Sequence, residues 1–70
     1  KRTIRDKALS YLSEQAKQQK SNLFEIPFNR QELADFLSVE RSALSAELSK
    51  LQNEGLIKFR KNKFELLKAP

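Results

Sequence analysis

The sequence predicts a mainly α-helical domain that ends in a small β-hairpin, and two patterns carry this prediction. Apolar residues recur with a helical period of three to four positions in three segments before Gly55. After Gly55 the period changes to two, which is typical of strands. The chain has 70 residues with one glycine and two prolines, so few breaks interrupt it. We therefore expect a single domain over residues 1–70.

The first helix is predicted from Thr3 to about Gln19. Its apolar residues stand at positions 4, 8, 12 and 16, with 9 and 11 beside them, which is one face of a helix. Thr3 can cap its start, because Asp6 follows three residues later. Residues 23–27 then alternate apolar and polar positions, which predicts a short strand, and Pro27 suits the end of a strand because it has no N–H.

Two shorter helices joined by a tight turn are predicted next. Asn29 is a favoured N-cap and Glu32 stands three residues later, so the second helix begins there. After a turn at residues 38–39, the third helix is predicted from about Arg41 to Asn53. Gly55 suits the left-handed residue that follows the end of a helix.

The residues after Gly55 predict a hairpin with a basic tip at Arg60–Lys63, where Asn62 tolerates a left-handed turn. The complete order is helix, strand, helix, turn, helix and hairpin, which is the winged helix-turn-helix arrangement. All five phenylalanines fall at periodic apolar positions, so they are expected in the core rather than on a stacking surface: Phe24, Phe28, Phe36, Phe59 and Phe64.

The composition excludes several classes of function. The chain has no cysteine and no histidine, so disulfides, zinc sites and the usual nucleophile–base pairs cannot form, and we expect no enzyme and no metal site. No apolar run is long enough to span a membrane, and a cytoplasmic protein is expected. Fourteen basic and nine acidic residues give a net charge of +5, which suggests an anionic partner, most often nucleic acid.

The third helix is the candidate reading element, because the second helix of a helix-turn-helix can lie in the major groove of duplex DNA. Arg41, in its first turn, is its only arginine and is expected to contact guanine in a bidentate manner. Small residues opposite the leucine stripe complete the candidate base contacts: Ser42, Ser45 and Ala46. The alternative reading of this face is ordinary solvated surface.

Residues on both sides of the reading helix are expected to hold the DNA backbone. The start of the second helix carries free N–H groups and a partial positive charge, and the basic hairpin tip can grip phosphates. The predicted phosphate contacts are Asn29, Arg30, Gln31, Ser49, Arg60, Lys61 and Lys63. Two plainer readings stand beside this one, since Asn29 is also a cap and charge at a hairpin tip also blunts an exposed edge.

The distribution of charge supports a different class of function, a winged-helix protein–protein interaction module without DNA readout. Residues 29–55 hold three basic and five acidic groups, a net charge of −2, whereas residues 1–28 and 56–70 carry +3 and +4. The helix-turn-helix is therefore slightly acidic. Glu40 and Glu47, at the third helix, are the weakest point of the DNA-binding hypothesis.

The run IPFNRQELADFLSVERSALSAELSKLQNEGLI, residues 26–57, resembles the C-terminal winged-helix domain of the Crp/Fnr transcription regulators. The resemblance implies sequence-specific binding of double-stranded DNA at a pseudo-palindromic site, with residues 41–53 in the major groove. It also implies that the chain is a fragment of a homodimeric bacterial regulator, with RNA polymerase as a further partner. The domain itself then needs no cofactor, and a small-molecule or other effector would act on a sensor domain outside the chain.

Single positions carry over from this resemblance. Arg41 matches the arginine of the family that contacts guanine, and Arg30 and Gln31 match its phosphate-contacting pair. Ser42 and Ala46 stand where the family often has glutamate and a second arginine, so this chain departs from the best-known half-site of the family.

Overall fold

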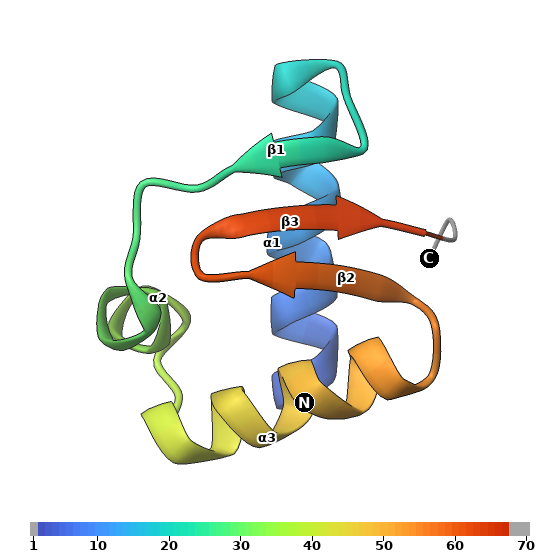
Figure 1. Ribbon diagram of the computed structural model, residues 1–70. Coiled ribbons are helices and arrows are strands. Elements are labelled where there is room, and N and C mark those ends of the chain that lie inside the picture. The colour runs from blue at the N-terminus through green and yellow to red at the C-terminus, as the bar shows by residue number, and fades with distance from the viewer. Residues whose placement is uncertain (1, 68–70) are drawn as a thin grey trace.

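Three helices and three short strands make up the computed structural model, which describes residues 2–67. The helices are α1 (Ile4–Gln19), α2 (Arg30–Leu37) and α3 (Arg41–Asn53), and the strands are β1 (Leu23–Glu25), β2 (Ile57–Arg60) and β3 (Lys63–Leu66). The sheet lies in front of α1, while α3 crosses below it (Figure 1). The predicted winged helix-turn-helix is confirmed, with α2 and α3 as the helix-turn-helix and β2–β3 as the wing.

Both predicted capping boxes are present. The Thr3 hydroxyl accepts a hydrogen bond from the Asp6 N–H at 3.1 Å, and the Asp6 carboxylate accepts one from the Thr3 N–H at 3.5 Å. Asn29 and Glu32 repeat this exchange at 2.8 Å in both directions. Each box satisfies backbone donors that the start of a helix leaves unpaired. In contrast, Glu40 precedes α3, and its side chain accepts no capping hydrogen bond.

Residues in the left-handed region shape the turns. Gly55 has φ 80° after α3, as predicted, and Ser38 has φ 60° between α2 and α3. At the wing tip the residue that takes the left-handed conformation is Lys61, with φ 57°, and not Asn62, which would also tolerate it. Asn62 is instead held by Ile26, the residue that follows β1: its carbonyl accepts from the Ile26 N–H at 2.9 Å, and its side-chain amide donates to the Ile26 carbonyl at 3.1 Å.

The sheet contains one strand more than the predicted hairpin. Its central strand, β3, pairs antiparallel with both β1 and β2. Phe64 of β3 stands in register with Phe24 of β1 and Phe59 of β2, and the ring centroids are 6.4 and 5.6 Å apart. The sequence predicted β1 as a strand but not its partner, because a period of two sets the face of a strand and not its neighbour.

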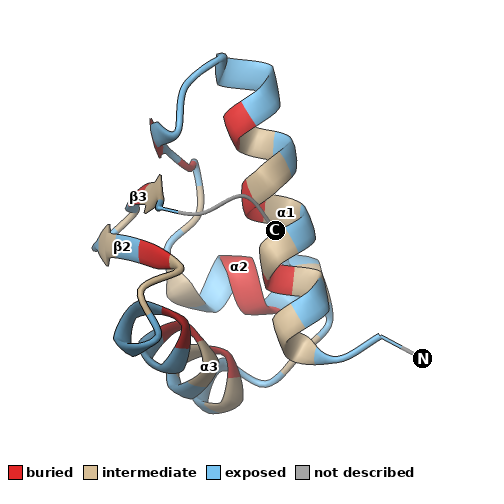
Figure 2. Ribbon diagram, turned by 90° about the vertical axis from the view of Figure 1, so that its right-hand side faces the viewer, coloured by how far each residue is buried: buried red, intermediate tan, exposed pale blue. Residues whose placement is uncertain are grey.

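The core lies where α1, the helix-turn-helix and the sheet meet, and the buried segments of the three helices turn toward it (Figure 2). Ala34 is fully buried in α2, where its small side chain lets α3 pack closely. The other buried residues are Ala8, Leu12, Ala16, Phe24, Ile26, Leu33, Leu44, Leu48, Leu51, Ile57 and Phe64.

Phe36 is the exception among the predicted core aromatic residues, because it is 58% exposed. Its ring centroid lies 5.4 Å from that of Tyr11 and 5.2 Å from that of Phe28, at the outer side of α1 and α2. The inward direction of the short helix α2 is set by Leu33 and Ala34. Phe36 follows the helical period but lies to one side of that direction, so the prediction of burial is wrong for this residue.

Within residues 2–67, no helix combines the length and the apolar character needed to cross a membrane.

Candidate nucleic-acid interface

The outward face of α3 is built from short side chains. Ser42, Ala46 and Ser49 are exposed, and Ser45 is half-buried. Leucines at positions 44, 48 and 51 hold the opposite face in the core. The result is a smooth helical surface, and such a surface lets a helix backbone approach the floor of a major groove.

Two exposed residues that were not predicted extend this face toward the end of α3. Asn53 stands four residues after Ser49 and seven after Ala46, and Lys50 is adjacent to Ser49. The same helical spacing that selected the serines includes Asn53, so the signal was present in the sequence. Lys50 is the second cation of α3, after Arg41.

Arg41 and Arg30 bring two positive charges together from separate helices. Arg41 opens α3 and is exposed, whereas Arg30 opens α2 and is half-buried. Burial lowers the pKa of Arg30, and the nearby charge of Arg41 lowers it further. Among the ion pairs of residues 2–67, neither guanidinium takes part. Adjacent cations without an acidic partner form a surface suited to an anion.

Arg30 also joins α2 to the wing. Its Nη2 atom donates a hydrogen bond to the Lys61 carbonyl at 2.7 Å. Its guanidinium carbon lies 5.4 Å from the ring centroids of both Phe59 and Phe64, which is cation–π geometry. The residue predicted for phosphate contact therefore also contacts the wing. The sequence carries no signal for a contact between a side chain and a backbone carbonyl 31 residues away.

The remaining predicted residues at the start of α2 are exposed and partly engaged. The Asn29 side chain accepts from the Glu32 N–H, so its role as a cap is confirmed. The Gln31 amide donates to the Asp35 carboxylate at 3.0 Å along the helix. The N–H groups of Arg30 and Gln31 precede the first backbone hydrogen bond of α2 and give this end its partial positive charge.

The wing tip carries three exposed cations, Arg60, Lys61 and Lys63. A hollow of about 430 Å³ separates part of the tip from the start of α2, and Asn29, Arg30, Lys61 and Asn62 contribute to its wall. The contact between Arg30 and Lys61 bridges the two elements beside it. Three of the predicted phosphate contacts, Asn29, Arg30 and Lys61, therefore lie together around this hollow.

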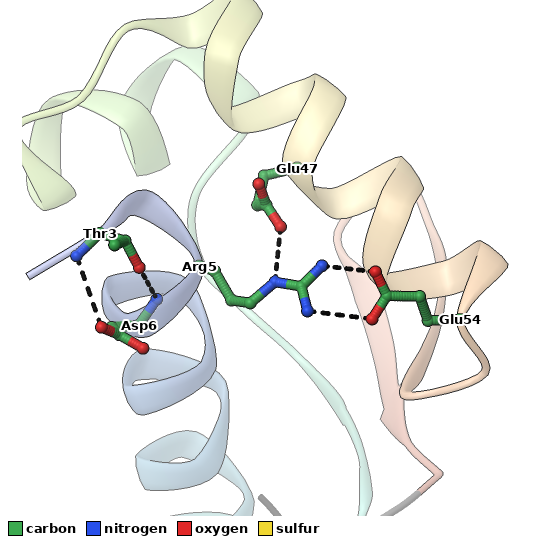
Figure 3. A network of polar contacts seen from close by, with 5 residues as sticks. All are labelled: Thr3, Arg5, Asp6, Glu47 and Glu54. Atoms are coloured by element: carbon green, nitrogen blue, oxygen red, sulfur yellow. Dashed lines mark hydrogen bonds and ion pairs between the residues drawn. The ribbon is translucent and has the colours of Figure 1, made fainter.

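The acidic residues at the other flank of α3 are turned toward α1. Arg5 donates from Nε to Glu47 at 2.7 Å, and from Nη1 and Nη2 to the two oxygens of Glu54 at 2.9 and 2.6 Å (Figure 3). The Glu47 side chain is 18% exposed. The hydrogen bond from Arg5 lowers the pKa of Glu54, and the two carboxylates raise the pKa of Arg5. Glu47 is therefore paired and no longer counts against DNA binding by α3, whereas Glu40 is exposed.

Comparison with known proteins adds a family and a fold match. A sequence model of the Crp-like helix-turn-helix domain matches residues 7–70. The solved structure of FixK2 from Bradyrhizobium japonicum is similar, with a TM-score of 0.81 at 20% sequence identity. The match covers 97% of this chain and 39% of the FixK2 chain, so the chain spans less than half of that protein's length. A search of curated proteins finds no match.

Proposed function

The chain belongs to the family of Crp-like helix-turn-helix domains, which are DNA-binding domains of transcription regulators, and we propose that it reads a specific duplex sequence through α3. The family is not enzymatic, which confirms the prediction that the chain is not an enzyme. One observation carries the proposal: the exposed face of α3 begins at Arg41, continues over short side chains, and lies beside a cationic edge.

The base contacts proceed from the start of α3 toward its middle. Arg41 donates two hydrogen bonds to O6 and N7 of a guanine, a contact worth about 1–3 kcal/mol of discrimination. Ser42 and Ser45 donate to or accept from base edges, and the Ala46 methyl group packs on a thymine methyl. Because serine pairs with several bases, the guanine contact sets most of the sequence preference.

The phosphate contacts fix the register of α3 without reading sequence. Asn29, Arg30 and Gln31 offer the backbone N–H groups and side chains of the start of α2, and Ser49 contacts a phosphate from α3 itself. The wing supplies Arg60, Lys61 and Lys63. Each phosphate neutralised by a cation releases counterions, so the affinity falls as the salt concentration rises.

The proposal extends to a larger protein, because the chain corresponds to 39% of the FixK2 chain. Two copies of the domain in a homodimeric bacterial regulator would read the two halves of a pseudo-palindromic site. A small-molecule or other effector would bind a separate sensor domain, and RNA polymerase would be a further partner. With bacterial DNA as its target, the protein works in the cytoplasm.

Selection of bound sequences from a random duplex pool at low salt tests this function. We expect an enriched site that contains guanine, with wild-type affinity that falls as salt rises. In Arg41→Ala we expect the preference for that guanine to be lost, while binding to unrelated duplex changes less. Absence of any duplex binding at low salt would contradict the proposal, and an equal loss on specific and unrelated DNA would contradict the role of Arg41.

Protein binding by the same fold is a second candidate function, and one observation favours it. Phe36 is 58% exposed and lies against Tyr11 on the outer side of α1 and α2. Phe36→Ser separates the candidates, since DNA binding through α3 predicts unchanged duplex affinity. If instead neither wild-type chain nor variant binds duplex, the protein-interaction module becomes the better interpretation.

A further inference from the structure

Arg5 of α1 binds two carboxylates of the helix-turn-helix segment, those of Glu47 and Glu54. Arg5 uses Nε for Glu47 and both terminal nitrogens for Glu54, with donor–acceptor distances of 2.6–2.9 Å (Figure 3). Glu47 of α3 and Glu54, which follows the helix with helical backbone angles, are seven residues apart, so both side chains lie on the same flank. The planar fork of arginine constrains the direction of both carboxylates, which the rotating ammonium of a lysine does not do.

The clamped carboxylates have a consequence for any anion that approaches α3. Glu47 directly follows Ala46 in the sequence, yet Ala46 is exposed while the Glu47 side chain is 18% exposed. A glutamate that is free to change rotamer beside Ala46 could extend toward the outward face of α3. Within a screening length of about 10 Å at 0.1 M salt, it would repel the phosphates that flank a bound helix.

We propose that Arg5 is a positioning residue for DNA binding, which holds Glu47 and Glu54 against α1 and thereby keeps two carboxylates away from the DNA backbone. The inference rests on the proposed function, since it concerns duplex binding by α3. It adds a residue of α1 that contacts no DNA and that acts on affinity through α3.

Arg5→Ala is the first variant to compare with wild type, by fluorescence anisotropy on a labelled mixed-sequence duplex at low salt. Lys17→Ala is the matched control, because it removes the same charge from the same helix at an exposed site outside the ion pairs of residues 2–67. We expect Arg5→Ala to weaken binding about two- to fivefold more than the control does. Equal losses in the two variants would overturn the inference.

A four-protein cycle separates positioning from net charge. It compares wild type, Arg5→Ala, the pair Glu47→Gln and Glu54→Gln, and the triple variant. A pure charge effect predicts that the two glutamines tighten duplex binding equally with or without Arg5. Positioning predicts a larger gain without Arg5, about twofold or more, because only free carboxylates can approach the phosphates. Equal gains in both backgrounds would overturn the inference.

Circular dichroism shows whether each variant keeps its helices. If Arg5→Ala does not, the same cycle is run with Arg5→Lys, which keeps the charge but not the bidentate fork, and the same inequality is expected. If the wild-type chain binds no duplex, the proposed function fails and the inference fails with it. If wild type binds and the cycle shows no coupling, the inference alone fails.

Discussion

The two flanks of α3 carry opposite imbalances of charge. On the wing side, Arg41 lies near Arg30 without an acidic partner among the described residues, close enough to lower the pKa of Arg30. On the α1 side, one cation, Arg5, faces the two carboxylates of Glu47 and Glu54. Within residues 2–67, the helix-turn-helix thus has two cations without an ion pair at one edge, and at the other edge two of its five carboxylates are paired with Arg5. The net charge of residues 29–55 does not show that cations and carboxylates lie on different flanks of α3.

Removal of the anchor common to both flanks has the largest expected effect. Leu44 is fully buried at the start of α3 and faces the core from the same helix that carries both charge patterns. We expect Leu44→Ala to lower the free energy of unfolding by about 2–5 kcal/mol, measured by urea denaturation. Ser42→Ala, two residues earlier on the exposed face of α3, is the control and is expected to change the free energy of unfolding little. A loss below about 1 kcal/mol in Leu44→Ala would mean that α3 is anchored elsewhere.

Arg41 and Lys50 separate base readout from simple attraction on the same helix. Both are exposed cations of α3, at its first turn and its last turn. Arg41→Ala is expected to lose about 1–3 kcal/mol of discrimination for the selected duplex over unrelated duplex. Lys50→Ala is expected to weaken binding to the selected duplex and to the unrelated duplex by a similar factor. Titrations of the two duplexes with each variant measure this, and equal discrimination in both variants would remove the distinction between the two cations.

A substitution of Arg30 tests whether its contacts with the wing stabilise the wing. Loss of its hydrogen bond to Lys61 and of its contacts with Phe59 and Phe64 is expected to cost about 1 kcal/mol of stability in Arg30→Ala. We expect amide hydrogen exchange to become faster in the wing while the amides of α1 change little. Unchanged protection in the wing would show that the pairing of β3 with β1 and β2 fixes the tip without Arg30.

The pH dependence of stability gives the smallest expected effect and concerns the α1 side. Arg5 lowers the pKa of Glu54, so the folded state binds fewer protons than the unfolded state at that carboxyl. The resulting stabilisation is present above the ordinary glutamate range and is lost as the pH falls through the lowered pKa of the folded state. The difference in thermal midpoint between wild type and Arg5→Ala should therefore shrink toward acid pH. A constant difference from neutral to acid pH would contradict this linkage.

The elements and their ends were predictable from local sequence. Thr3 and Asn29 begin helices because each is followed three residues later by a carboxylate that completes a capping box. Gly55 follows α3 because glycine adopts a positive φ without steric cost. The exposed face of α3 followed from spacing alone, and the same spacing extends to Asn53. Local rules suffice for these features because each depends on residues within a few positions.

The features that the sequence did not predict arise where neighbours in space are distant in sequence. The partner of β1, the bond of Asn62 to Ile26, and the position of Phe36 all depend on how the elements pack. The roles of Arg5 and Arg30 belong to the same class, because their partners lie 42, 49 and 31 residues away.

The amino-acid sequence by itself determined the family, the order of helices and strands, and the candidate face of α3, because periodicity, caps and turn residues act locally. The tertiary structure decided which charges meet. It placed Arg30 near Arg41 and brought Arg5 against Glu47 and Glu54, because packing of α1, α2 and the wing around α3 sets those distances. The electrostatic surface of this domain is therefore a property of its fold more than of its composition.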